Sequence, residues 1–214
     1  RLAEAGADHV QVFGGGGGVI VPEEIALLRS RGVTIFAPED GQRLGLAGMI
    51  NTLVQACDVD LAATPPTVED VVSGSATALA RAITVLEAGR SADLAKALLD
   101  HARPVPVLGI TGTGGSGKSS LTDELLRRLR VDQEDKLRVA VLAIDPTRRR
   151  SGGALLGDRI RMNSVHGEQV FFRSLATRTA GSAVPEHLDD VIAACKAAGF
   201  DLVVVETPGI GQGD

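Results

Sequence analysis

The chain has 214 residues, of which 44% are hydrophobic, so its apolar content is sufficient for one large core or two smaller ones. A formal net charge of −5, an aromatic content of 2% and the lack of Trp and Tyr argue against a nucleic-acid partner, which needs basic and base-stacking side chains. We expect no membrane partner, because no apolar run approaches the roughly 20 residues that span a bilayer and no signal-peptide pattern is present.

The two cysteines, Cys57 and Cys195, have a spacing that suits neither a zinc site nor a disulfide framework. A reduced, cytoplasmic setting is therefore expected. The first residue is Arg1 rather than Met, and residues 1–7 have the pattern of a helix. We therefore expect the chain to be a segment of a longer protein.

The amino-terminal part alternates between strand and helix patterns. An apolar run at residues 9–13 predicts a strand, five glycines follow, and residues 22–31 have a helical pattern. The unit then repeats, with a strand at residues 33–36, a loop at residues 37–41 and a helix that ends near Cys57. This alternation predicts an α/β fold with a parallel sheet, of which two units form only a part.

Residues 62–67 contain two consecutive prolines and form a predicted domain boundary. The Ala- and Leu-rich stretch that follows, divided at Gly89–Ser91, predicts a pair of helices. We interpret it as a connecting arm packed on a neighbouring domain, with a membrane-surface helix as the remote alternative. The predicted division is an amino-terminal domain at residues 1–61, a helical linker at residues 62–103 and a second α/β domain at residues 104–214.

Strands and helices alternate again in the carboxy-terminal part. Two near-continuous apolar runs, at residues 139–144 and 202–205, are typical of parallel strands that are buried on both faces. The predicted elements are strands at 105–111, 138–144, 169–173 and 201–206, and helices at 118–130 and 185–198.

The segment Gly112–Ser119, with the sequence GTGGSGKS, matches a P-loop and lies between a predicted strand and a predicted helix. Its glycines let successive backbone N–H groups face phosphate oxygens at the positive end of the helix. Lys118 is expected to contact the β- and γ-phosphates, and the Ser119 hydroxyl to ligate magnesium. The alternative is a glycine-rich turn with no ligand. It is disfavoured because every fixed position of the P-loop pattern is matched and the segment lies between a predicted strand and a predicted helix.

Two acids follow buried strands, Asp145 after the second and Glu206 after the fourth strand of this part. Ligands of open α/β sheets bind at the carboxyl ends of strands, so both carboxylates are expected at the nucleotide. Either one alone could simply cap a turn.

Asp158, Arg159 and Arg161 lie within a glycine-rich segment at residues 151–162. We interpret it as a loop that orders around magnesium and the γ-phosphate, against the alternative of a solvated surface loop. Gly209 and Gly211 similarly suggest a second switch, in which the Gly209 N–H donates to the γ-phosphate. Gln212 is a weak candidate for orienting water. The run Arg148–Arg150 is read as an exposed basic turn in preference to an arginine finger.

The P-loop, the segment from Asp145 to Met162 and the sequence ETPGIGQ at 206–212 together resemble the G-protein chaperones of adenosylcobalamin-dependent acyl-CoA mutases. Residues 79–87 resemble the helical arm before the P-loop in that family. The resemblance implies Lys118, Asp158 and Glu206 in catalysis. It implies magnesium ligation or support of the ligands by Ser119, Asp145, Asp158, Glu206 and Thr207, and nucleotide contacts by Gly112, Gly114, Gly115, Ser116, Gly117, Lys118, Ser119, Ser120, Arg161 and Gly209.

The amino-terminal part resembles the carboxy-terminal half of a flavodoxin-like cobalamin-binding domain, through residues 12–22 and 32–38. The order of the two domains is similar to that of the fused isobutyryl-CoA mutases. This resemblance implies an adenosylcobalamin groove lined by Gly15, Gly16, Gly17, Gly18, Phe36 and Pro38. It also leads us to expect an acyl-CoA mutase barrel in the same longer chain, a homodimer and an adenosyltransferase that delivers cobalamin.

Two motifs of these families are expected beyond the chain, namely Asp-x-His-x-x-Gly with the lower cobalt ligand before Arg1 and Asn-Lys-x-Asp, which reads guanine, after Asp214. GTP rather than ATP is thus implied by the resemblance alone. Together with this resemblance, the sequence predicts a magnesium-dependent GTPase that couples GTP hydrolysis to loading or protecting adenosylcobalamin in an isobutyryl-CoA mutase. The alternatives are a small-molecule kinase with a P-loop and a cobalamin carrier with a regulatory nucleotide site.

Overall fold

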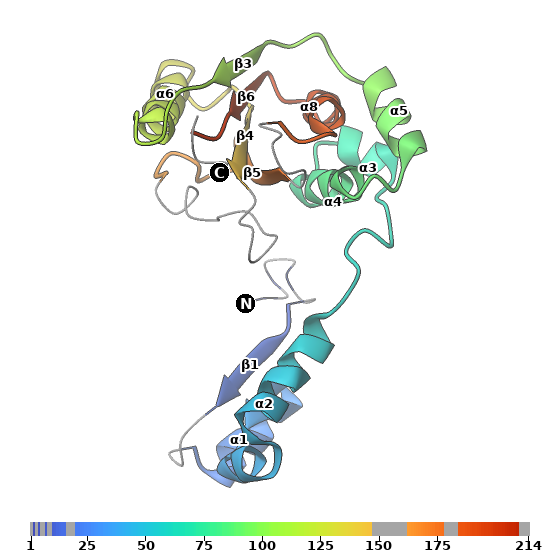
Figure 1. The fold of residues 1–214 in the computed structure, drawn as a ribbon, viewed down its shortest axis with the longest axis vertical. Coiled ribbons are helices and arrows are strands. Elements are labelled where there is room, and N and C mark those ends of the chain that lie inside the picture. Colours follow the sequence, from blue (N-terminus) through green and yellow to red (C-terminus); the bar gives the residue numbers. More distant parts are fainter. Residues whose placement is uncertain are drawn as a thin grey trace. The chain divides into compact units, whose positions relative to one another are not determined.

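The computed structural model describes residues 2, 4, 7, 10–15, 20–146, 162–177 and 184–209. The chain divides into two compact units, residues 1–60 and residues 61–214, and we describe each by itself (Figure 1). Within the described ranges, no helix has the length and apolar character that crossing a membrane requires.

The first unit consists of two strand–helix repeats. Its elements are β1 (Val12–Gly15), α1 (Pro22–Ser30), β2 (Val33–Phe36) and α2 (Pro38–Cys57). The two strands pair in parallel, and Gly15 lies beside Phe36 at their carboxyl ends. The predicted alternation of strands and helices and the parallel pairing are therefore confirmed for this unit.

The prediction of a loop at residues 37–41 is wrong, because α2 begins at Pro38. Pro38 occupies the first turn, where its missing N–H costs nothing, and the Asp40 side chain accepts a hydrogen bond from the Ala37 N–H at 3.0 Å. The helix is kinked at Gly45, whose φ of 64° is left-handed. The sequence pattern missed the first turn because residues 38–43 carry no apolar side chain that marks a buried helix face, so the apolar periodicity begins only at Leu44.

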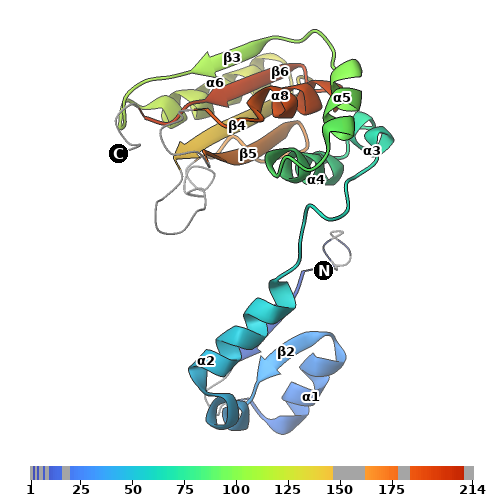
Figure 2. The ribbon, with the colours of Figure 1, turned by 45° about the vertical axis from the view of Figure 1, so that its right-hand side comes forward.

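The second unit has a four-stranded sheet between two layers of helices (Figure 2). Its strands, in the order β3-β6-β4-β5, are all parallel, which confirms the predicted α/β class. The strands are β3 (Val107–Ile110), β4 (Val139–Pro146), β5 (Val170–Thr177) and β6 (Leu202–Glu206), and the helices are α3 (Val68–Val72), α4 (Ala76–Glu87), α5 (Ala92–Asp100), α6 (Lys118–Asp132) and α8 (Leu188–Ala197).

Residues 68–100 form three helices, where the sequence pattern predicted two. Gly74, with a φ of 86°, ends α3, and the Ser75 hydroxyl accepts a hydrogen bond from the Ala78 N–H at the start of α4. Thr67 and Ser91 cap α3 and α5 in the same way. These helices lie in the same unit as the sheet, so the arm packs on the second α/β region. The three-part division of the chain stays a prediction.

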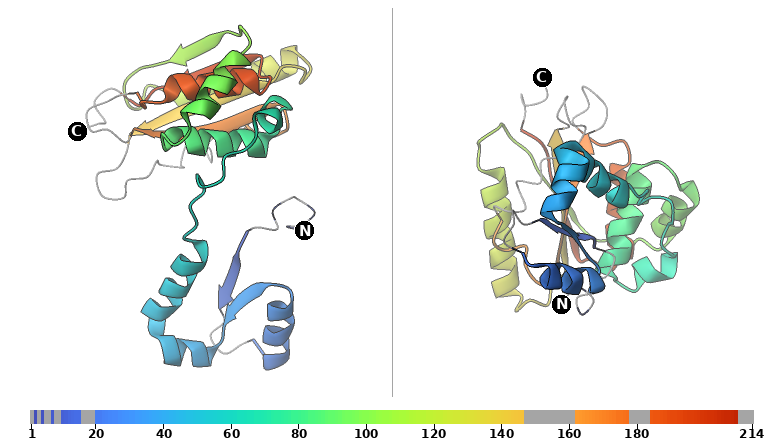
Figure 3. Two further views of the ribbon diagram at one scale, coloured as in Figure 1. Left: turned by 90° about the vertical axis from the view of Figure 1, so that its right-hand side faces the viewer. Right: turned by 90° about the horizontal axis from the view of Figure 1, so that it is seen from below.

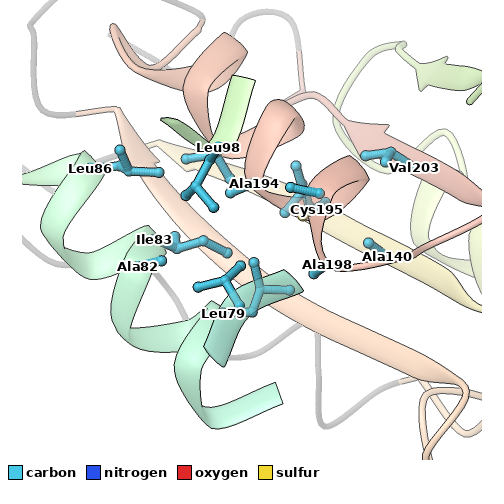
Figure 4. Close-up of a cluster of buried hydrophobic side chains, with 14 of the residues drawn as sticks. Leu79, Ala82, Ile83, Leu86, Leu98, Ala140, Ala194, Cys195, Ala198 and Val203 are labelled. Atoms are coloured by element: carbon cyan, nitrogen blue, oxygen red, sulfur yellow. The ribbon is translucent and has the colours of Figure 1, made fainter. Parts of the chain in front are cut away.

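Helices α4, α5 and α8 cover one face of the sheet and α6 covers the other (Figure 3). Leu79 and Ile83 of α4, Leu98 of α5 and Cys195 of α8 are fully buried in the larger cluster (Figure 4). Leu126 of α6 belongs to the smaller cluster on the opposite face. Because the same strands contribute to both clusters, the sheet holds α4 and α6 in fixed positions.

The two cysteines are expected to differ in reactivity. Burial raises the pKa of the Cys195 thiol to about 12, whereas Cys57 is exposed. A thiol reagent at pH 8 should therefore modify one cysteine in the native protein and two in denaturant, measured by the absorbance of the released thiolate. Modification of the native Cys57→Ser variant at the wild-type rate would contradict this assignment.

The same pKa shift predicts a dependence of stability on pH. The unfolded Cys195 thiol ionises near the ordinary cysteine pKa of 9.0, while the folded thiol stays neutral up to about 12. Its contribution to stability is thus fully present below pH 9 and is lost as the pH rises toward 12. In urea unfolding across this range, Cys195→Ala should lose less stability than the wild type.

Candidate functional site

The P-loop joins the carboxyl end of β3 to the first residue of α6. Gly117 precedes α6 with a φ of 85°, a left-handed conformation that costs other residues free energy. A Cβ at Gly112 would lie 3.0 Å from the Ser116 Oγ, so the loop closes tightly over this position. The Lys118 Nζ donates hydrogen bonds to the carbonyl oxygens of Gly112 (3.1 Å) and Thr113 (3.0 Å), and its ammonium group therefore lies over the loop.

The strand order brings the two predicted acids next to the P-loop. Strand β6 lies between β3 and β4, and Glu206 is in register with Ile110 on one side and Ala143 on the other. Asp145 lies two residues beyond Ala143 on β4. Both acids are buried, with 4% of Glu206 and 6% of Asp145 exposed. Parallel pairing thus brings together, at the carboxyl ends of the strands, three segments that are far apart in the sequence.

Glu206 is linked directly to α6 through two hydroxyl groups. The Ser119 Oγ donates to its Oε1 at 2.6 Å, and the Thr122 Oγ1 lies 2.9 Å from its Oε2. The backbone N–H of Thr207 donates to the Ile110 carbonyl oxygen at 2.9 Å and ties the end of β6 to β3. The carboxylate is therefore held in one orientation beside Ser119, the predicted magnesium ligand.

These segments surround an open cavity of about 610 Å³. It is lined by most of the predicted site residues, namely Gly114, Gly115, Ser116, Gly117, Lys118, Ser119, Ser120, Asp145, Glu206, Thr207 and Gly209. Gly112 is not among the lining residues and serves as an acceptor for Lys118. The predicted residues Asp158 and Arg161, like Arg148–Arg150, Gly211 and Gln212, lie outside the described residues.

The cavity also has lining residues that the sequence pattern did not single out, among them Asp123, Glu124, Met162 and Asn163. Glu124 accepts hydrogen bonds from Arg127 and Arg128, which hold the pKa of its carboxyl below the ordinary value. Asp123 and Glu124 follow the P-loop lysine by five and six residues. Their position in the second turn of α6, close to the P-loop, could have indicated that they line the cavity. No such signal existed for Asn163, which reaches the cavity only through the fold.

Thr122 is a further residue that the sequence pattern missed. Its side chain is fully buried, and its hydroxyl lies within hydrogen-bond distance of both Glu206 and the Lys118 carbonyl oxygen (3.0 Å). Thr122→Val keeps the shape but removes the donor, so it is expected to destabilise the fold by about 1–3 kcal/mol in urea unfolding. Thr122→Ser keeps the hydroxyl and should recover most of that loss. A loss in Thr122→Ser without a loss in Thr122→Val would show that the methyl group, not the hydroxyl, matters.

The predicted cobalamin groove is only partly within the described residues. Gly15 and Phe36 are register partners at the carboxyl ends of β1 and β2, and Pro38 starts α2 two residues later. Gly16, Gly17 and Gly18 lie outside the described part of the chain. The described residues therefore share the strand-end position at which α/β sheets bind ligands.

Among the described residues, no group of three or more His, Cys, Asp or Glu side chains could hold a metal ion by itself. The two strand-end acids and the Ser119 hydroxyl nevertheless converge on one cavity, and all are oxygen donors of the kind that magnesium prefers. Magnesium commonly keeps several waters and takes further ligands from bound phosphates, so few protein donors suffice. The residues present fit a magnesium–nucleotide complex.

Comparison with known proteins gives the family. The chain is 70% identical to the fused isobutyryl-CoA mutase of Nocardia farcinica and 62% identical to that of Cupriavidus metallidurans; each match covers all of this chain and 20% of the relative. The chain thus spans about a fifth of the length of these curated relatives. It is 33% identical to GTPase ArgK of Escherichia coli over 66% of this chain and 44% of that protein.

A solved structure titled LAO/AO transport system kinase matches 68% of this chain and 43% of its own, with 27% identity and a TM-score of 0.49. The family model "methylmalonyl Co-A mutase-associated GTPase MeaB" matches residues 79–214, which begin in α4 and include the whole cavity described above. On this match, which covers more than half of its residues, the chain belongs to the family of methylmalonyl Co-A mutase-associated GTPase MeaB.

Proposed function

We propose that the second unit binds GTP with magnesium and hydrolyses it to GDP and phosphate. The observation that carries the proposal is the single cavity in which the P-loop, with Lys118, faces both strand-end acids. A P-loop alone indicates phosphate binding, whereas acids held beside its serine hydroxyl are the arrangement that also seats a metal. The family description supports GTP as the nucleotide.

The charges that line the cavity support a metal-bound nucleotide. The described lining residues include one lysine, Lys118, and four acids, Asp123, Glu124, Asp145 and Glu206. Glu124 is paired with Arg127 and Arg128, but the other three acids still outnumber Lys118, so a bare triphosphate would be repelled. Asp145 and Glu206 would help to hold a divalent cation, which would offset this repulsion when bound. Binding of the nucleotide is therefore expected to depend steeply on magnesium.

In the proposed reaction, water attacks the γ-phosphate in line with the bond to the leaving GDP. The P-loop N–H groups and Lys118 hold the β- and γ-phosphates and neutralise the charge that develops on them. The Ser119 hydroxyl would offer an oxygen lone pair to magnesium while it still donates its own hydrogen bond to Glu206. Magnesium, when bound, neutralises phosphate charge. We further propose contacts of Asp158 with magnesium and of Arg161 with phosphate.

We also propose that GTP binding and hydrolysis are coupled to the loading or protection of adenosylcobalamin in an attached acyl-CoA mutase. The similarity to fused isobutyryl-CoA mutases supports an in-chain mutase barrel that converts isobutyryl-CoA to n-butyryl-CoA. The strand-end position of Gly15 and Phe36 fits a groove for the cofactor. We also propose that the longer protein forms a homodimer in the cytoplasm and receives cobalamin from an adenosyltransferase.

Phosphate release under single-turnover conditions tests the hydrolysis proposal. The full chain, in its longer natural context, is mixed with GTP or ATP in magnesium or in excess chelator, without a phosphate acceptor. We expect release from GTP in magnesium and little release from ATP or in chelator. A kinase would release no phosphate without its acceptor, and a carrier with a regulatory site would bind GTP without cleaving it, so either result would refute a GTPase.

A further inference from the structure

The turn that follows Met162 is bound to α6 through its backbone. The Asp123 Oδ1 accepts the Ser164 N–H at 2.7 Å, and the Arg130 Nη1 donates to the carbonyl oxygens of Ser164 (3.1 Å) and His166 (2.8 Å). Arg130 is itself paired with Asp135. Two side chains of one helix thus hold both the N–H and the C=O of Ser164, and the turn cannot shift without α6.

Packing fixes the same turn from the inside. Met162 is 1% exposed, and Ser164 and Val165 are also buried. Met162 and Val165 share the smaller hydrophobic cluster with Leu126 of α6. Met162 and the exposed Asn163 meanwhile line the nucleotide cavity. One wall of the cavity is therefore built by a turn whose position depends on α6, the helix that begins at Lys118.

The charge of Asp123 does not explain its place in this wall. It lines a cavity that we propose to hold a triphosphate, and a carboxylate there repels the ligand. Its short hydrogen bond to a buried N–H is of the charge-assisted kind, which is about twice as strong as a neutral one. The free energy gained by holding the Ser164 N–H offsets the repulsion between the Asp123 carboxylate and the phosphates.

We propose that Asp123 is a positioning residue for the nucleotide, acting through Ser164 to hold Met162 and Asn163 at the cavity wall. The inference rests on the proposed GTPase function, since it concerns the same cavity. It gives Asp123 a role that no motif assigns, and it extends the P-loop site to a segment more than forty residues later in the chain.

The charge and the hydrogen bond predict opposite effects of removing the carboxylate. If only the charge mattered, Asp123→Ala and Asp123→Asn would both lower KM for the nucleotide. If Asp123 positions the wall, Asp123→Ala should raise KM for GTP about 10-fold, as expected for loss of a hydrogen bond to a charged group. Asp123→Asn, whose amide oxygen still accepts the Ser164 N–H, should recover most of the lost affinity.

The experiment measures kcat and KM for GTP in the full chain, and the Kd of a fluorescent GDP analogue, for these two variants. Asp132→Ala, an exposed acid on the last turn of α6, is the matched control and should equal the wild type. Asp123→Glu keeps the charge but displaces the acceptor by one methylene, so it should also raise KM for GTP. It replaces Asp123→Ala in the test if the alanine variant does not fold.

A rise in KM for the alanine variant with recovery by asparagine supports the proposal, because a merely structural defect would lower thermal stability without separating these two variants in KM. An unchanged or lowered KM for both Asp123→Ala and Asp123→Glu, or equal effects of Ala and Asn, would overturn it. A wild-type chain that does not hydrolyse GTP would instead refute the GTPase function, so the two failures are distinguishable.

Discussion

Replacing Lys118 with alanine is expected to lower GTP hydrolysis by about 100-fold or more, in line with loss of one preorganised group that stabilises transition-state charge. In the structure, the Lys118 ammonium already lies over the P-loop on two carbonyl oxygens, next to the expected position of the phosphates. The alanine variant also lacks the only lysine among the described lining residues, so Asp123, Asp145 and Glu206 repel nucleotide more strongly. Nucleotide affinity should therefore fall together with the rate.

The measurement is phosphate release at several GTP concentrations, with circular dichroism as a check that the variant is folded. Lys136→Ala is the matched control, because Lys136 is highly exposed and lies outside the cavity. Hydrolysis by Lys118→Ala at the wild-type rate would refute the assignment of the cavity to catalysis. Equal loss in Lys136→Ala would show that the effect is not specific to the P-loop.

Leu79→Ala in α4 is expected to destabilise the second unit by about 2–5 kcal/mol, the usual range for a buried leucine. Leu79 is fully buried in the cluster that joins α4, α5 and α8 to the sheet. Because the same cluster includes Ala140 and Leu142 of β4, the cavity left by the substitution lies in the core of the sheet. The helices before the P-loop should therefore unfold together with the nucleotide-binding region.

Urea unfolding tests this prediction with two probes, helix content and binding of a fluorescent GDP analogue. Both transitions should move to lower urea by the same amount in Leu79→Ala. Leu99→Ala in α5 is the control, because Leu99 is 63% exposed and should cost little. A loss of helix signal at low urea, with nucleotide binding retained to the wild-type midpoint, would mean that the arm is a separate folding unit.

The interaction between β5 and α4 supports a single cooperative unit. Arg173 on β5 donates hydrogen bonds to Glu87 (2.8 Å) and Thr84 (3.1 Å), both on α4. The Glu87 side chain is only 10% exposed, so breaking this pair leaves a buried charge. The contact fixes β5, one of the two edge strands of the sheet, to α4.

Much of the fold was predictable because local patterns determined it. Unbroken apolar runs gave the positions of β4 and β6, and the P-loop match placed the start of α6 at Lys118. The helical stretch before the P-loop was recognised as helical, but its division at Gly74 was not. A single glycine between Ser73 and Ser75 occurs both inside helices and at their ends, and the left-handed φ at Gly74 decides this only in the folded chain.

By itself, the sequence determined the P-loop, the two strand-end acids and the parallel α/β class, because each depends on residue types at short, fixed spacings. The tertiary structure decided which of these segments meet. Strand order placed β6 between β3 and β4 and so brought Glu206 to Ser119, which lies 87 residues earlier. It also brought Asp123 to Ser164 and Thr122 to Glu206. Such contacts depend on how strands and helices pack, and no periodicity along the chain encodes them.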